Sequence, residues 1–102
     1  MAINKQQQYL VIYDIADPKR LGKTHRLLKK QGLPVQYSVF SVVASGSGIK
    51  HLLQSIEEII NEKEDDVRCY ALPANIDCKT IGRQYFPDDI ALFSNGVARL
   101  LV

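Results

Sequence analysis

Hydrophobic and polar positions along the first third of the chain change from a strand pattern to a helix pattern. Residues 9–15 are almost continuously apolar and rich in β-formers, which predicts a central strand covered on one or both faces. Asp17 followed by Pro18 is a typical helix start, and Gly32 is a typical stop. The helix between them presents one face made of Leu21, Thr24 and Leu28.

The middle of the chain repeats this order. Residues 35–44 are β-branched and aromatic, which predicts one long strand or two strands joined by a tight bulge. After the turn "SGSG", residues 49–60 have the apolar spacing of a second amphipathic helix, and residues 67–73 predict another strand. The order indicates an α+β fold, a ferredoxin-like split βαβ sandwich (βαββαβ) with both helices on one side.

The chain of 102 residues is predicted to form a single domain, 1–102, because this length supports one core and not two. Near its end, Asn95 and Gly96 stand between two apolar runs, which is a hairpin signal. We therefore expect residues 74–102 to form a C-terminal extension, a strand or hairpin that pairs at the sheet edge, in its own subunit or at the edge of a dimer.

The sequence argues against a membrane-spanning protein and against a secreted one. No run reaches the roughly 18 apolar residues of a membrane span, and the polar start "MAINKQQQ" does not fit the core of a signal peptide. We expect a cytoplasmic protein without a membrane partner. The spacing of Cys69 and Cys78 matches no zinc pattern, so reduced thiols are expected, with Cys69 in the core.

Charge is strongly segregated, although the net charge is only +2. Residues 19–30 hold six basic side chains and no acid, whereas residues 57–66 hold six acids and one lysine. This layout suggests an anionic partner on one face, such as nucleic acid, and the competing interpretation is a solvated helix face. At helical spacing the basic stripe consists of Lys19, Lys23, Arg26 and Lys30.

An aspartate, Asp14, ends the first predicted strand, and its charge needs a partner. Removing a carboxylate from water is costly unless a metal ion or another cation binds it. Magnesium needs only one or two carboxylates plus substrate phosphates, and in a two-fold dimer Asp14 and its symmetry mate would supply two. The alternative is that Asp14 forms a turn or pairs with Arg20. Asp17, beside Pro18, is expected to be a structural cap.

The stretch "QYSVF" has a mixed pattern. If it continues as a strand, one face carries Gln36, Ser38 and Phe40, where a sheet core would hold only apolar residues. These polar groups would then meet a partner subunit or line a site.

Four motifs carry a resemblance to a known family. They are "YDI" at the first strand's end, "DPKR" opening the basic helix, "GLPVQYSVF", and "DDVRCYAL" after an acidic turn. In this order they cover about two thirds of the chain, residues 9–73. The chain resembles the small CRISPR-associated endonuclease family, the second of the two universal proteins of spacer acquisition.

The resemblance implies a homodimer with a divalent metal, Mg²⁺ or Mn²⁺, shared between the two copies of Asp14. It also implies an endonuclease acting on RNA or DNA and a scaffold that joins the CRISPR integrase subunit. Arg20 and Lys23 match the family's basic positions, and Arg68 matches the arginine of the last motif. The residues expected to support the dimer seam are Tyr13, Gln36, Ser38 and Phe40.

The residues and the resemblance leave three functions open. The first is a metal-dependent endonuclease of CRISPR spacer acquisition and antiviral defence, with Asp14 as catalytic metal ligand and no evident general base. The second is a non-catalytic dimeric scaffold that binds duplex DNA, and the third is a toxin-type ribonuclease on the same fold. An RNA-recognition-motif protein fits least, because the paired aromatic patterns are missing. Nucleic-acid contacts are predicted for Lys19, Arg20, Lys23, Arg26 and Lys30.

Overall fold

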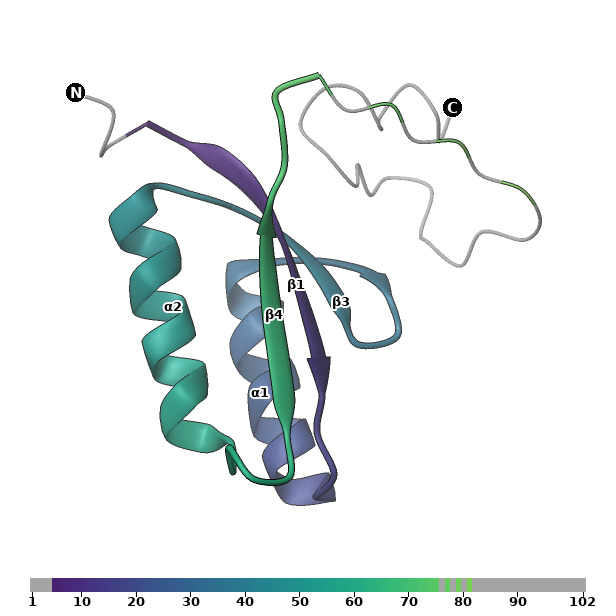
Figure 1. Ribbon diagram of the computed structural model, residues 1–102, viewed down its shortest axis with the longest axis vertical. Coiled ribbons are helices and arrows are strands. Elements are labelled where there is room, and N and C mark those ends of the chain that lie inside the picture. Colours follow the sequence, from purple (N-terminus) through teal and green to yellow (C-terminus); the bar gives the residue numbers. More distant parts are fainter. Residues whose placement is uncertain (1–4, 76, 78, 80, 82–102) are drawn as a thin grey trace.

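The computed structural model describes residues 5–75, 77, 79 and 81. Its elements follow the predicted βαββαβ order, and the α+β prediction is confirmed (Figure 1). The elements are β1 (Gln7–Asp14), α1 (Pro18–Gln31), β2 (Gly32–Gln36), β3 (Val39–Ala44), α2 (Gly46–Ile59) and β4 (Asp66–Ala71).

The four strands form one antiparallel sheet in the order β2-β3-β1-β4. Strand β1 is central, as its continuous apolar run predicts, with β3 on one side and β4 on the other. Val11 pairs with Phe40 on β3 and with Cys69 on β4, which fixes the register across the three strands. Because directly opposed residues point to the same face, this register decides which side chains share each side of the sheet.

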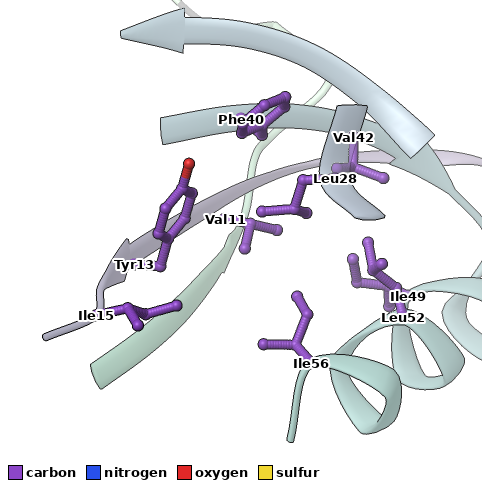
Figure 2. Close-up of a cluster of buried hydrophobic side chains, with 9 residues drawn as sticks. All are labelled: Val11, Tyr13, Ile15, Leu28, Phe40, Val42, Ile49, Leu52 and Ile56. Atoms are coloured by element: carbon purple, nitrogen blue, oxygen red, sulfur yellow. The ribbon is translucent and has the colours of Figure 1, made fainter. Parts of the chain in front are cut away.

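One face of the sheet is packed against both helices, and the core lies between the sheet and the two helices (Figure 2). Side chains of β1 and β3 meet side chains of α1 and α2 there, which confirms that both helices cover the same side. Burial of each large apolar side chain stabilises the fold by roughly 1.5–3 kcal/mol. The buried cluster comprises Val11, Tyr13, Ile15, Leu28, Phe40, Val42, Ile49, Leu52 and Ile56.

The helix ends agree with the sequence signals, except at the start of α2. Asp17 caps α1 by accepting the backbone N–H groups of Lys19 and Arg20, both at 3.0 Å. Gly32 ends α1 in an extended conformation, and glycine is needed there because a side chain would collide with the carbonyl oxygen of Ser41 on the neighbouring strand. Helix α2 starts earlier than predicted, because Ser45 caps it by accepting the N–H of Gly48 at 3.0 Å.

The stretch between β2 and β3 resolves the choice between one strand and two. Tyr37 and Ser38 form a turn, and Ser38 has a φ of 61°, in the left-handed region. The strand alternation therefore does not run through "QYSVF". The proposed polar face is wrong: Phe40 lies in the protomer core with 1% of its surface exposed, and so does Tyr13 with 4%. The predicted support of a dimer seam by Tyr13 and Phe40 stays a prediction.

The opposite face of the sheet, called here the open face, carries the alternate residues. Val43 is 50% exposed and Tyr70 is 47% exposed on this face, so no described segment covers them fully. The predicted C-terminal extension, including the Asn95–Gly96 hairpin, lies almost entirely outside the described residues and stays a prediction. Neither helix in the described part of the chain is long and apolar enough to cross a membrane. Paired residues place Leu10, Ile12, Asp14, Val39, Ser41, Val43, Asp66, Arg68 and Tyr70 on the open face.

Candidate nucleic-acid site at the end of strand β1

Asp14 is the last residue of β1 and is exposed, whereas Tyr13 before it and Ile15 after it are buried in the core. The strand's alternation therefore turns the Asp14 carboxylate to the open face of the sheet. Within the described residues, its side chain forms no hydrogen bond or ion pair. The prediction that Asp14 ends the first strand agrees with this placement.

A second carboxylate, which the sequence analysis missed, lies directly across from Asp14. Asp66 opens β4 and is the cross-strand partner of Asp14. Directly opposed residues of an antiparallel pair hold their Cβ atoms about 4.5–5.5 Å apart on one face. The pairing follows from the register of β4 against β1. The stretch "DDVRCYAL" alone does not fix that register, so the sequence carried no direct signal for it.

Asp66 also has a basic neighbour on the open face. The Nε atom of Arg68 donates to Asp66 Oδ2 at 3.0 Å, and both side chains are more than half exposed. Hydrogen bonds to Tyr70 and Asp66 raise the pKa of Arg68 above its ordinary value. The strand end thus presents two carboxylates and a guanidinium to solvent.

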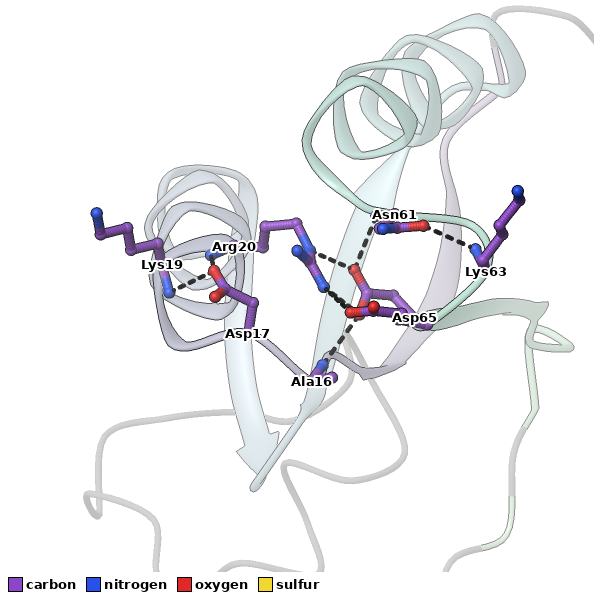
Figure 3. Close-up of polar contacts among 8 residues, drawn as sticks. Ala16, Asp17, Lys19, Arg20, Asn61, Lys63 and Asp65 are labelled. Carbon is purple, nitrogen blue, oxygen red and sulfur yellow. Dashed lines mark hydrogen bonds and ion pairs between the residues drawn. The ribbon is translucent and has the colours of Figure 1, made fainter.

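Arg20, predicted to contact nucleic acid, is bound instead to two acids of the loop before β4 (Figure 3). Its Nε donates to Asp65 Oδ2 at 2.7 Å, and its Nη2 donates to Asp65 Oδ1 and to Glu64 Oε1, both at 3.1 Å. These bonds raise the pKa of Arg20 further above its ordinary value. The alternative that Arg20 pairs with Asp14 is therefore not what the structure contains, and Arg20 is not part of a free basic surface.

The ion pairs of Arg20 with Glu64 and Asp65 are called here the clamp. Asp65 also connects this clamp to the backbone that follows β1. Its carboxylate accepts the N–H of Ala16 at 3.0 Å and the N–H of Asn61 at 2.8 Å, and its side chain has no exposed surface. The Arg20 guanidinium, together with the two backbone donors, holds the pKa of Asp65 well below its usual range. The loop that leads away from Asp14 is thus fixed to the loop that leads into β4.

The four other predicted nucleic-acid contacts remain together on α1. All four are exposed, because Thr24 and Leu28 turn the opposite face of the helix into the core. None of the four forms an ion pair with another described residue. Their helix packs on the core side of the sheet, so the stripe and the open face are separate surfaces. The stripe consists of Lys19, Lys23, Arg26 and Lys30.

The turn between β2 and β3 lies beside the end of β1. The N–H of Tyr13 donates to the carbonyl oxygen of Ser38 at 3.0 Å, so the turn is held next to the backbone of Asp14. Gln36 is exposed and Ser38 is half-buried at this end of the sheet. Their predicted role at a dimer seam stays a prediction.

Sequence reasoning also gave no role to His25, which supports the core side of the strand end. Its Nδ1 lies 3.2 Å from the Tyr13 hydroxyl, and its ring packs edge-on against Phe40 with centroids 5.4 Å apart. Burial raises the pKa of Tyr13. We interpret His25 as a packing residue, because it lies on the face opposite to Asp14.

The donor set at the strand end suits a hard divalent cation only in part. Carboxylate oxygens are the ligands that Mg²⁺ and Mn²⁺ prefer, and Asp14 and Asp66 provide them on one face. Among the described residues, no group of three or more potential metal ligands occurs. Water and substrate phosphate, or a second copy of the chain, would have to complete such a site.

Comparison with known proteins identifies the family. The family described as "CRISPR associated protein Cas2" matches residues 7–79, which include both ends of the described sheet. The chain belongs to the Cas2 family. The resemblance inferred from the four motifs is therefore confirmed, and with it the prediction of a CRISPR-associated nuclease at the level of the family.

Two named relatives support the Cas2 assignment over most of their length. "CRISPR-associated endoribonuclease Cas2 1" of Nitrosomonas europaea is 40% identical over 82 residues, covering 80% of this chain and 78% of that protein. "CRISPR-associated endoribonuclease Cas2 2" of Thermodesulfovibrio yellowstonii is 37% identical over 86 residues, covering 83% and 94%. The predicted nuclease class is thus shared with both relatives.

Solved structures confirm the ferredoxin-like fold of this Cas2 protein. A structure described as "Crystal structure of cas2" superposes with a TM-score of 0.72 at 29% identity, covering 84% of this chain and 98% of that chain. Cas2 of Streptococcus pyogenes superposes with a TM-score of 0.67 at 32% identity, covering 74% and 99%.

Proposed function

We propose that this Cas2 protein is a metal-dependent endoribonuclease that works as a homodimer in CRISPR spacer acquisition. The observation that carries the proposal is the exposed Asp14 carboxylate, which has no partner among the described residues and faces Asp66 across the strand pair. The names of the relatives from N. europaea and T. yellowstonii support RNA as the substrate.

Asp14 and Asp66 would hold a divalent cation, Mg²⁺ or Mn²⁺. Such a cation, when bound, polarises a phosphoryl oxygen and lowers the pKa of bound water, which is the chemistry that phosphodiester hydrolysis needs. Arg68 neutralises part of the negative charge beside Asp66 on the open face. This guanidinium would draw the phosphate backbone toward the strand end and offset charge that develops on it.

A second copy of the chain is the proposed cover of the open face. Val43 and Tyr70 leave about half of their surface exposed, and Leu10, which lies opposite Tyr70, and Ile12 continue this face along β1. Contiguous exposed apolar surface of this kind marks an interaction site more often than free surface. In a two-fold arrangement over this face, both copies of Asp14 would lie at the same seam, as the sequence predicts.

A second function is favoured by a separate observation. The basic stripe lies on α1, on the other side of the sheet from Asp14, and its four cations have no acidic partner among the described residues. A surface of this kind suits the backbone of duplex DNA without requiring hydrolysis. A scaffold role beside the CRISPR integrase subunit therefore rests on the stripe, whereas the nuclease role rests on Asp14. The family match favours both over a toxin-type ribonuclease.

Cleavage of labelled single-stranded RNA and of duplex DNA tests the nuclease proposal. We expect wild type to cut RNA with Mg²⁺ or Mn²⁺ and not with EDTA, and Asp14→Asn to cut at least about 100-fold more slowly because metal-held charge stabilisation is lost. Glu58→Gln, which changes an exposed acid on α2, is the matched control. If Asp14→Asn cuts as fast as wild type, the nuclease assignment to this site is wrong. Duplex binding that survives in Asp14→Asn would leave the scaffold role.

A further inference from the structure

Tyr37 stands out because its ring has almost no protein contact. It is 98% exposed, in the turn between β2 and β3, whereas the other tyrosines of the sheet are at least half covered or lie in the core. A large aromatic side chain in water gains nothing from burial in the free protomer. The protein therefore holds an aromatic surface ready for contact with something outside the described chain.

The turn that carries Tyr37 is tightly placed. Gln36 before it pairs with Val39, and Ser38 after it takes a φ of 61°. The Ser38 carbonyl oxygen also accepts the N–H of Tyr13 at 3.0 Å. Two strands and a third backbone contact therefore fix the Cα position of Tyr37, and only its side chain is free to turn.

The same contacts place Tyr37 at the Asp14 end of the sheet. Ile12 on β1 pairs with Val39 on β3, and Tyr13 bonds to Ser38, one step further along both chains. Tyr37 precedes Ser38 in this turn and Asp14 follows Tyr13 on β1, so each lies one residue from an end of this hydrogen bond. The turn between β2 and β3 accordingly lies beside the end of β1 in Figure 1.

We infer that Tyr37 stacks on an unpaired base of the strand held at Asp14, and that it makes the site prefer single-stranded nucleic acid over duplex. The inference rests on the proposed function and names the substrate form of that site. An exposed aromatic ring offers a stacking surface to any splayed base, whereas bases in a duplex are already stacked on each other. The phosphates on either side of that base would lie toward the carboxylates and Arg68.

The neighbours of Tyr37 favour a nucleic-acid strand over a protein surface. Gln36 is polar and exposed, and Ser38 is polar and half-buried, so Tyr37 is an isolated aromatic between hydrogen-bonding residues. The centre of a protein interface is instead a contiguous apolar patch, and on this molecule that description fits the open face. A single aromatic with polar neighbours matches the pattern of base stacking with hydrogen bonds to base edges.

Binding measured without cleavage tests the inference. Fluorescence anisotropy of a short labelled single-stranded RNA, and of the same sequence as a duplex, is compared for wild type, Tyr37→Ala and Tyr37→Phe, all in the Asp14→Ala background. We expect Tyr37→Ala to weaken single-strand binding by about 5- to 100-fold and Tyr37→Phe to keep most of it, since a phenyl ring still stacks. Duplex binding should be the same in all three. An oligonucleotide with abasic sites should bind weakly, whichever residue occupies position 37.

Several results would overturn the inference. Equal single-strand affinity of Tyr37→Ala and wild type would do so, and so would equal losses on single strand and duplex. A shift of Tyr37→Ala from dimer to monomer in sedimentation would assign the ring to a second copy of the chain. Failure of the stacking inference leaves metal-dependent cleavage by wild type intact. Failure of the proposed function is separate: wild type then cuts no RNA, and if it also binds no single strand, the stacking inference falls with it.

Discussion

Arg20 and Asp65 join the start of α1 to the loop before β4 by a two-point ion pair, although 45 residues separate them in the sequence. The Asp65 side chain is fully covered, so its charge is stabilised by Arg20 and by two backbone N–H groups, not by water. Removing these partners, or neutralising the covered carboxylate, destabilises the folded state. The clamp therefore makes the end of the sheet that carries Asp14 sensitive to acid.

The first prediction concerns stability at low pH. The folded-state pKa of Asp65 is lowered, so its contribution is fully present above the unfolded value of about 4 and is lost as the pH falls toward the folded value. We predict that the free energy of unfolding, measured with urea, falls between about pH 5 and pH 3. Asp65→Asn should be less stable than wild type at neutral pH and should show a shallower fall.

Glu62→Gln is the control for this measurement, because Glu62 is an exposed acid in the same loop. It should keep both the neutral-pH stability and the acid slope of wild type. An Asp65→Asn variant whose acid slope equals that of wild type would show that other carboxylates dominate.

Local signals predicted the fold well because they act within a few residues. The cap at Asp17 and the stop at Gly32 lie at the boundaries that the structure has, and the apolar run of residues 9–15 overlaps most of β1. The turn at Tyr37–Ser38 was harder, because no glycine or asparagine marks a residue with positive φ there. Without that turn the strand alternation continued, and it assigned Phe40 to the wrong environment.

The candidate site was predicted less completely because it depends on pairing between distant segments. Asp14 was identified from its place after a strand, a local feature. The position of Asp66 opposite Asp14 and the capture of Arg20 by Asp65 depend on the register of β4 and on the course of its preceding loop. A sequence lists the candidate charges, but only the packed sheet decides which of them meet.

The second prediction separates metal binding from activity. Because Asp14 has no described side-chain partner, Asp14→Asn should unfold at the wild-type temperature or slightly above it in EDTA, since directly opposed like charges destabilise strand pairs. With Mg²⁺ or Mn²⁺ at 100 times its Kd, wild type should gain about 2.7 kcal/mol and Asp14→Asn should gain far less. Thermal unfolding monitored by circular dichroism, with Glu58→Gln as control, gives the answer. Equal metal-dependent gains in both proteins would exclude Asp14 as a ligand.

The third prediction concerns the basic stripe. The logarithm of duplex affinity falls with the logarithm of salt concentration by about 0.9 per phosphate contact. Replacing Lys23 and Arg26 by glutamine should therefore reduce the slope by up to about 1.8 and weaken binding to all sequences alike. Lys50→Gln, an exposed lysine on α2, is the matched control. A slope unchanged in the double variant, measured by anisotropy on a duplex, would exclude the stripe as the duplex surface.

The fourth prediction concerns a buried hydroxyl in the core. Thr24 on α1 is fully buried, and its Oγ1 has no hydrogen-bond partner among the described residues. Valine has nearly the same shape without the polar atom, so Thr24→Val should raise the free energy of unfolding by about 1 kcal/mol. Thr24→Ala should lower it, because it removes a methyl group as well and leaves a void. Urea denaturation of both variants tests the pair, and a Thr24→Val protein less stable than wild type would mean that the hydroxyl is satisfied in solution.

The fifth prediction concerns the open face. If a second copy covers it, a charge at Val43 would be buried in the dimer without a partner, while in the free protomer this half-exposed position keeps the charge in water. Val43→Asp should therefore be a folded monomer under conditions in which wild type is a dimer, as measured by sedimentation velocity. Leu21→Asp is the matched control, since Leu21 is an exposed apolar residue on α1, away from the open face, and its change should leave the dimer intact. A Val43→Asp protein that still sediments as a dimer would place the subunit contact elsewhere, and Asp14 would then have to bind its cation with Asp66 and water alone.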